Sequence, residues 1–310
     1  MSKDKVFEDL SDLITEERNP RSVNIDLMST DEIIRLINDK DKAVAEAVRM
    51  ELPNISRAVD LIVNAFRTKG RLIYVGAGTS GRLGMYDAAE CPPTFGVDPE
   101  MVTAVIAGGN DALVMSIEGA EDDEKAGRED LRRVLRSDKD VVCGIAASAR
   151  TPYVKGALDE AAAAGAKRIF IVCNPINKMK FDFDVVIGPV TGPEVITGST
   201  RMKAGLAQKM ILNMLTTASM IKMGKVYENL MVDLKLNSKK LTERAKKLIM
   251  TAADVDYEKA AELLIASGGN VKTAIFMAKT GCSFDDASNF LSQGEGFLRK
   301  VIREWESSQA

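Results

Sequence analysis

Short apolar runs alternate with amphipathic stretches through the middle of the chain. The runs are rich in valine and isoleucine and show little alternation of polar and apolar positions, which is typical of strands covered on both faces. They predict strands at 71–75, 102–107, 140–146, 168–173 and 184–188. Helical periodicity between them predicts helices at 81–90, 124–136, 152–164 and 200–223. This order predicts an α/β fold with a doubly wound, parallel five-stranded sheet, whose ligands sit at the carboxyl ends of the strands.

The chain before residue 71 shows helical signals only. Ser29 to Glu32 form a capping box that predicts a helix to about residue 37, and a second helical stretch covers 41–51. Pro53 suits the first turn of a third helix. We therefore expect an N-terminal helical segment over residues 1–70, followed by the α/β core over 71–224.

Beyond Gly224 the pattern changes again. Residues 225–238 are typical of a connector, and no strand signal follows them. Three or four short helices are predicted, near 239–252, 257–266, 270–279 and 283–291. Each is too short to be stable alone, so residues 225–310 are predicted to form a small C-terminal helical domain.

The chain of 310 residues contains no histidine. This absence removes Ser-His-Asp and Cys-His catalysis, metal sites built on histidine, and any imidazole base. Proton transfer near neutral pH must therefore depend on carboxylates, lysines, tyrosines or water.

Charge and cysteine usage narrow the class of protein further. The net charge is −3 and no long basic run occurs, which argues against a nucleic-acid partner. No apolar stretch is long enough to span a membrane, and Met1–Asp4 do not begin a signal peptide. The cysteines are scattered without metal-binding spacing, which favours buried, reduced thiols in a cytoplasmic protein. They are Cys91, Cys143, Cys173 and Cys282.

A glycine-rich loop follows the first predicted strand. Gly78, Thr79 and Ser80 lie between that strand and the next helix, where hydroxyls and free amides can hold a phosphate. The loop also matches the GxGxxG dinucleotide fingerprint, but Gly108-Gly109 stand where its acidic residue is expected. Arg82 excludes a Walker loop. The remaining alternative is an ordinary tight turn.

Two further polar loops repeat this design. Ser148, Arg150 and Thr151 follow the strand at 140–146, and Glu194, Ser199 and Lys203 accompany the start of the helix at 200–223. Helix caps explain either loop equally well. Two hydroxyl-bearing strand–helix junctions in neighbouring units nevertheless favour one shared phosphate site.

Carboxylates accompany these loops. Glu90 is predicted at the carboxyl end of the helix at 81–90, immediately before Cys91-Pro92-Pro93, where a negative charge opposes the helix dipole. The segment from Glu118 to Glu124 is rich in acidic residues and precedes the helix at 124–136. Acidic residues at a helix N-terminus commonly complement the helix dipole, so most of them have this ordinary explanation. A phosphate cradle near an unfavourably placed carboxylate suggests acid–base chemistry on a phosphorylated small molecule.

Six motifs resemble, in order, those of the N-acetylmuramic acid 6-phosphate etherases. They are GAGTSGRLG, DAAECPPTFG, IAGG, EGAEDD, IAASARTPY and TGSTRMKAG. Residues 15–20 also resemble the N-terminal segment of that family, and the core is similar to the wider sugar-isomerase (SIS) class of phosphosugar-binding domains. Ala149 stands where the family usually has glycine.

The resemblance implies a chemical activity. It implies hydrolysis of the D-lactyl ether of N-acetylmuramic acid 6-phosphate to N-acetylglucosamine 6-phosphate and D-lactate, in the recycling of cell-wall murein. It also implies a homodimer without metal or cofactor, and places the two catalytic carboxylates at Glu90 and Glu121. We expect Glu90 to donate a proton and Glu121, before a helix N-terminus, to act as an ionised base.

Other classes of function are compatible with parts of the pattern. The chain could be a sugar-phosphate-sensing regulator related to the glucokinase regulatory proteins, although those contain two such domains and this chain has one set of loops. It could also be an aldose–ketose isomerase of the SIS class that uses Glu194 as its base. A nicotinamide-dependent enzyme is a more distant alternative.

Overall fold

The computed structural model describes residues 13–176, 182–236 and 238–309. Met1–Asp4, where we predict no signal peptide, lie outside these ranges. The chain forms two compact units, one of Met1–Ala88 with Glu100–Thr216 and the other of Ala89–Pro99 with Thr217–Ala310. Within the described ranges, no helix has both the length and the apolar content needed to cross a lipid bilayer.

The first unit contains the predicted five-stranded parallel sheet. Its strands are β1 (Leu72–Gly76), β2 (Val102–Ile106), β3 (Val141–Ala146), β4 (Lys167–Val172) and β5 (Val185–Ile187). Their order in the sheet is β2-β1-β3-β4-β5. From β1 the chain moves to β2 on one side, and from β3 it moves to β4 on the opposite side. The gap between the carboxyl ends of β1 and β3 is therefore the switch point, where ligands bind in doubly wound folds.

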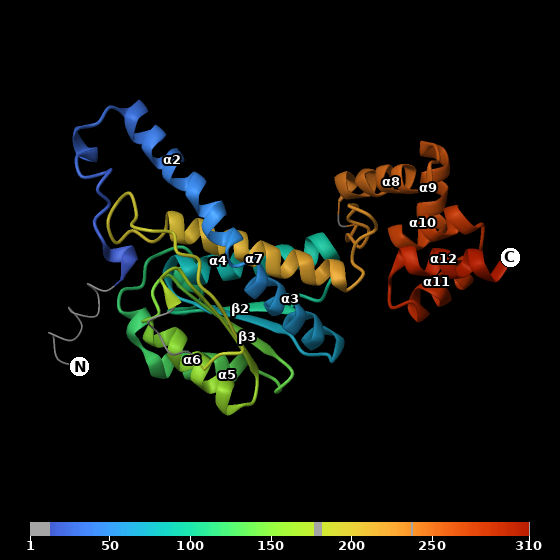
Figure 1. Ribbon diagram of the computed structural model, residues 1–310. Helices are drawn as coiled ribbons and strands as arrows, with labels where there is room; N and C mark the ends of the chain where they lie inside the picture. The colour runs from blue at the N-terminus through green and yellow to red at the C-terminus, as the bar shows by residue number, and fades with distance from the viewer. Residues whose placement is uncertain (1–12, 177–181, 237, 310) are drawn as a thin grey trace. The chain divides into compact units, whose positions relative to one another are not determined.

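Helices cover both faces of this sheet, as the fold class requires (Figure 1). On one face, Ile73 and Val75 share an apolar core with Tyr153 and Leu158, beneath α5 (Glu124–Val134) and α6 (Pro152–Ala163). On the other face lie α3 (Leu52–Arg67), α4 (Gly78–Phe95) and α7 (Lys203–Lys222). The near-continuous apolar strands of the sequence are thus explained by burial from both sides.

The N-terminal helices differ from the prediction in number. Helix α2 (Thr30–Arg49) is continuous, whereas the sequence predicted a break between residues 37 and 41. Asn38 and Asp39 at the predicted break are exposed, and Asp39 pairs with Lys42 one turn later, so solvated charges continue the helix. The capping box of Ser29 and Glu32 and the early Pro53 of α3 are confirmed. Two short 3-10 turns, η1 (Ile14–Glu16) and η2 (Ile25–Leu27), precede α2.

Helix α4 is longer than predicted, and this changes the setting of Glu90. The prediction ended the helix at Glu90 because prolines follow, but the helix continues through Pro92 and Pro93 to Phe95. Each proline removes one helical N–H donor, but both lie in the last turn, so any bend displaces only the final residues, and Gly96 ends the helix with a φ of 65°. The prediction that Glu90 lies at a helix carboxyl end is therefore wrong.

The second unit contains a helical bundle. Its helices are α8 (Lys239–Ala253), α9 (Tyr257–Ala266), α10 (Val271–Thr280), α11 (Phe284–Gln293) and α12 (Leu298–Gln309). The first four match the predicted helices, and α12 was missed. Phe276, Phe290 and Trp305 form an aromatic cluster in the core of the bundle. Trp305, the single tryptophan of the chain, ties α12 to that core.

A buried ion pair joins the starts of β1 and β3. Asp140 is 1% exposed and accepts hydrogen bonds from the Arg71 amide (2.9 Å), the Arg71 Nη2 atom (2.7 Å) and the Arg136 amide (3.0 Å). Burial acts to raise the pKa of Asp140, but the Arg71 guanidinium and the two amides outweigh it and hold the pKa below its usual value. This carboxylate therefore stabilises the folded state while it is ionised.

Replacing Asp140 with alanine is expected to destabilise the first unit by about 3–5 kcal/mol, because Arg71 would remain buried without its partner. The contribution should be present above the pKa of an unfolded aspartate, about 3.9, and be lost as the pH falls through the lower pKa of the folded state. Urea unfolding followed by far-ultraviolet circular dichroism measures the effect. Trp305 fluorescence reports the second unit separately, and Asp138→Ala, at an exposed neighbour, is the control. A loss below about 1 kcal/mol would contradict the assignment.

Candidate active site

The loop after β1 begins the candidate site. We call Ala77–Ser80 the cradle loop. Gly78 has a φ of 52°, and a Cβ atom on Gly76 would lie 2.6 Å from the Gly81 nitrogen, so the close turn requires glycine. The Gly81 amide donates to the Ala77 carbonyl at 3.2 Å. The amides of Gly78, Thr79 and Ser80 come before this first helical hydrogen bond. They belong to the first turn of the helix, whose N–H groups can donate hydrogen bonds to an anion.

Ser80 lies deeper than the sequence suggested. Its side chain is in α4, the residue is 8% exposed, and its Oγ donates to Oε1 of Gln208 in α7 at 3.0 Å. Thr79 lies half-buried beside it, and a Cβ atom on Gly205 of α7 would lie 3.4 Å from its Cγ2. The start of α4 is thus packed against the first turns of α7.

The loop after β3 lies next to the cradle loop. Gly76 and Ile145 are partners in the sheet, so both strands end at the same place. Thr151 is the N-cap residue of α6 but makes no side-chain capping hydrogen bond, so its hydroxyl is not used as the ordinary cap that the sequence left open. Ser148 is half-buried and Arg150 exposed. Four of the residues predicted to hold phosphate therefore lie at the ends of two adjacent strands, at the switch point of the sheet. They are Gly78, Thr79, Ser148 and Thr151.

The third polar cluster is engaged inside the protein. Glu194 is 0% exposed, and its carboxylate accepts hydrogen bonds from the Lys203 amide (3.1 Å) and the Ala204 amide (2.9 Å) at the start of α7. Lys203 Nζ donates to the Thr191 carbonyl at 2.6 Å, and burial lowers the pKa of Lys203 although Glu194 opposes this. Ser199 lies in the preceding loop, where its amide donates to the Ile196 carbonyl. In this structure Glu194 is fully buried and caps α7.

A cavity of about 190 Å³ brings Gly78 and Glu121 together. Its lining also includes Arg82, Ser116 and Glu118. Glu121 is exposed and belongs to the 3-10 turn η4 (Ala120–Asp122), which precedes α5.

The N-cap of α5 is Asp123, not Glu121. The Asp123 carboxylate accepts a hydrogen bond from the Ala126 amide at 2.8 Å. Asp123 thus performs the dipole-complementing role that the sequence left open for this acidic run, and Glu121 faces the cavity instead.

Glu90 is exposed on α4, within the stretch Ala89–Pro99 of the second unit. It is not part of the lining of the cavity that contains Glu121. The structure therefore brings Glu121, but not Glu90, together with the cradle loop inside one unit.

Sequence reasoning missed an N-terminal strap, which we define as Leu13–Ser22. Asn174, just after β4, donates to the Thr15 hydroxyl (3.1 Å) and to the Ala147 carbonyl of the β3 loop (2.9 Å). Asn19 and Ser22 donate to carbonyls of the segment that contains Glu194. A polar residue directly after a predicted strand was the available signal for Asn174, whereas the strap contacts depend on tertiary structure.

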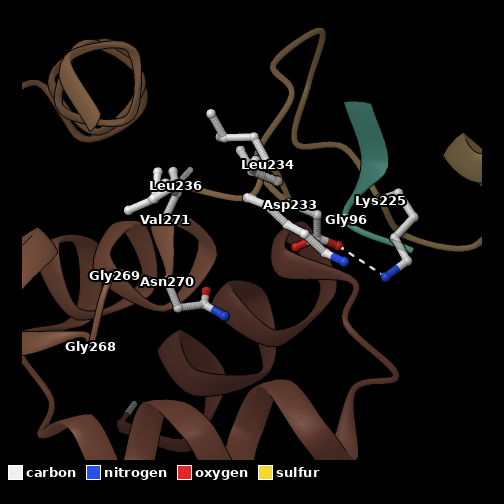
Figure 2. A pocket seen from close by; sticks show the side chains of 11 residues that line it. Gly96, Lys225, Asp233, Leu234, Leu236, Gly268, Gly269, Asn270 and Val271 are labelled. Carbon is white, nitrogen blue, oxygen red and sulfur yellow. Dashed lines mark ion pairs between the residues drawn. The ribbon is translucent and has the colours of Figure 1, made fainter. Parts of the chain in front are cut away.

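A larger cavity, of about 520 Å³, lies in the second unit (Figure 2). Asp233 at its edge pairs with Lys225 at 3.3 Å and with Lys272 at 2.8 Å. Burial lowers the pKa of Lys272, and Asp233 opposes that shift. No residue predicted to act on substrate belongs to the described lining of this cavity. We therefore place the candidate site at the smaller cavity, where the predicted chemistry is.

The cysteines are free thiols; Cys91, Cys143 and Cys173 are buried as predicted, whereas Cys282 is only partly buried. Cys143 and Cys173 are fully buried, and burial raises the pKa of the Cys173 thiol to about 12, with the Glu194 carboxylate adding to the shift. Neither thiol is a nucleophile at neutral pH.

Comparisons with known proteins agree with this fold and these motifs. Residues 54–162 match the family described as the glucokinase regulatory protein N-terminal SIS domain. N-acetylmuramic acid 6-phosphate etherase 2 of Vibrio cholerae serotype O1 is 51% identical, over 99% of this chain and 100% of that protein. The N-acetylmuramic acid 6-phosphate etherase of Clostridioides difficile is also 51% identical, over 96% of this chain and 98% of that protein.

A solved structure was also found. It is a putative phosphosugar isomerase involved in capsule formation from Bacteroides fragilis, with 23% identity and a TM-score of 0.47 over 63% of this chain and 91% of that one. The sequence relatives, at half identity over nearly their full length, settle the assignment that the motifs predicted. The chain belongs to the N-acetylmuramic acid 6-phosphate etherase family.

Proposed function

We propose that this protein cleaves the D-lactyl ether of N-acetylmuramic acid 6-phosphate to give N-acetylglucosamine 6-phosphate and D-lactate. The observation that carries the proposal is the identity of about half the residues, over nearly the whole chain, with proteins named for this substrate. The cavity that joins Gly78 to Glu121 supports it, because it places a carboxylate beside a turn suited to a phosphate.

The chemistry is an elimination followed by addition of water, which makes the protein a carbon–oxygen lyase. In the open-chain sugar the C2 proton is acidic because C2 is adjacent to the aldehyde. A base removes this proton, the C3–O bond breaks, and an acid protonates the lactyl oxygen as lactate leaves. Water then adds to C3, and C2 regains a proton. Two carboxylates can carry out these transfers without an imidazole.

The roles of the residues follow from this scheme. We infer that the amides of Gly78, Thr79 and Ser80, with the hydroxyls of Ser148 and Thr151, hold the phosphate, and that Arg150 adds positive charge nearby. We infer that Glu121 is the base, because it is exposed to the cavity beside the cradle loop. Glu90 is the proposed acid on the strength of the family motif alone.

In this proposal two members of the third polar cluster, Glu194 and Lys203, support the site without contacting the substrate. Glu194 and Lys203 are buried and bonded to backbone groups. We infer that they fix the loop that carries Ser199, so that Ser199 can contact the sugar. The isomerase alternative, which needs Glu194 as a base at substrate, gains no support from this arrangement.

We infer that the protein acts as a homodimer, which the family resemblance implies. The cavity that joins Gly78 to Glu121 is not lined by Glu90. We therefore infer that a second copy supplies this carboxylate to the site.

A mixed-dimer experiment tests this inference. Glu121→Gln and Glu90→Gln subunits, each inactive alone, are co-expressed with different tags and the mixed dimer is purified. If each site combines Glu121 of one copy with Glu90 of the other, one site of the mixed dimer is intact, and about half of the wild-type rate per dimer should return. No recovery in a mixed dimer that light scattering confirms would show that both carboxylates come from one copy.

Lactate release tests the function itself. Purified protein given N-acetylmuramic acid 6-phosphate should form equal amounts of D-lactate and N-acetylglucosamine 6-phosphate. Formation of a ketose without lactate would instead support an isomerase, and binding without turnover would support a sensing regulator. The free cysteines, three of them buried, support a cytoplasmic location, where such recycling would take place.

A further inference from the structure

Gln208 is the least explained polar residue near the cradle loop. It lies in α7, is 1% exposed, and accepts the Ser80 hydroxyl proton on its Oε1 at 3.0 Å. Its Nε2 atom is buried without a nitrogen or oxygen acceptor among the described residues, and the Cys173 sulfur, a weak acceptor, lies beside the amide. A buried N–H donor that meets no good acceptor is unfavourable and uncommon, so its presence next to a proposed phosphate site needs an explanation.

The hydroxyl of Ser80 has one proton to give. A serine hydroxyl donates one hydrogen bond and accepts others, and phosphate dianion oxygens only accept. In this structure that proton goes to Gln208. Ser80 can therefore donate to a phosphate oxygen only if it gives up its bond to the Gln208 carbonyl oxygen.

We propose that Gln208 is a positioning residue that turns its amide when a phosphate monoester binds, so that Nε2 donates to Ser80 Oγ and the Ser80 proton goes to the phosphate. The inference rests on the proposed function, in which the cradle loop holds the substrate phosphate. The rotation exchanges hydrogen-bond partners and moves no proton between heavy atoms. It also gives Nε2 an oxygen acceptor, which biases the loaded state towards the turned amide.

The other half of the rotated amide has a donor within reach. Cys173 faces the Gln208 side chain, and its thiol now lies 3.7 Å from the Ala204 carbonyl. The thiol keeps its proton because the site is fully buried. After the rotation Oε1 points towards this thiol, whose single S–H, a weak donor, turns from the Ala204 carbonyl to Oε1. Both ends of the amide then have partners.

Gln208→Glu separates donation from acceptance at this position. An ionised carboxylate can only accept, so it keeps the Ser80 proton, whereas a protonated carboxyl can donate to Ser80 Oγ. We measure the Kd for N-acetylglucosamine 6-phosphate by calorimetry, as a ratio of variant to wild type, between about pH 5.5 and pH 8.5. The ratio should rise about tenfold or more as the introduced carboxyl ionises. Dividing by the wild-type Kd removes the titration of the phosphate.

Two further variants separate positioning from packing. Gln208→Met fills the space without donor or acceptor, and its ratio should be raised but constant with pH. Ser219→Ala removes another fully buried hydroxyl of α7 and should leave the ratio near one. In a Ser80→Ala background neither Gln208 variant should weaken binding further, because the amide acts through Ser80.

Specific outcomes would overturn the inference. A pH-independent ratio for Gln208→Glu would do so, as would the same loss of affinity with Ser80 absent. If thermal melting shows that Gln208→Glu does not fold, the double-mutant cycle of Gln208→Met with Ser80→Ala decides alone. In that cycle, losses of sugar-phosphate affinity that add in the double variant refute the proposal. If wild-type protein binds neither the sugar phosphate nor inorganic phosphate, the proposal also falls. Binding is measured without turnover, so lactate release and the Gln208 effect can fail independently.

Discussion

Glu90→Gln is expected to fold normally and to lose about 10²- to 10⁴-fold in turnover, because general acid catalysis is worth that much and the lactyl oxygen is a poor leaving group. Glutamine keeps the shape of the side chain but cannot give up a proton. The residue is exposed on α4, so its replacement should leave the thermal midpoint nearly unchanged. The rate of lactate release at saturating substrate measures the effect.

The matched control is Glu306→Gln, which makes the same change at an exposed position of α12. It should retain the wild-type rate. A Glu90→Gln rate within a few-fold of wild type would remove Glu90 from the mechanism. Comparison with Glu121→Gln adds information, because loss of the base should also abolish exchange of the C2 proton with solvent, whereas loss of the acid should permit exchange without release of lactate.

Much of the first unit could be predicted because its strands are buried on both faces. Continuous runs of valine and isoleucine located all five strands to within two residues at each end. Their carboxyl ends then located the cradle loop and the loop with Ser148 by a rule of doubly wound folds. The glycines of this turn have local reasons, since Gly78 has a φ of 52° and a Cβ atom on Gly76 would lie 2.6 Å from the Gly81 nitrogen.

Failures of the prediction came from local rules that tertiary structure overrode. Prolines usually end helices, yet α4 continues past Pro92 and Pro93 to Phe95. Glu194 takes the helix-cap alternative that the sequence left open, and it can be buried because two amides of α7 satisfy its carboxylate. The bond between Ser80 and Gln208 joins positions 128 residues apart, and no periodicity or motif connects them.

The isotope content of the products decides which bond breaks. Elimination followed by hydration cleaves the C3–O bond of the sugar, so in ¹⁸O-water all the new oxygen should appear on C3 of N-acetylglucosamine 6-phosphate. The released lactate should keep the original ether oxygen and contain no label.

In heavy water the same mechanism places deuterium at C2, because the proton removed from C2 is replaced from solvent. Direct displacement at the lactyl carbon would instead label lactate and leave C2 untouched. A chain without histidine has carboxylates as its main proton carriers, and these can remove an acidic C2 proton far more readily than they can activate water against an unstrained ether. Mass spectrometry of both products measures how the ¹⁸O and the deuterium divide between the sugar phosphate and lactate. Label in lactate, or no deuterium at C2, would therefore reject the elimination together with the roles assigned to Glu90 and Glu121, while leaving the phosphate site of the cradle loop intact.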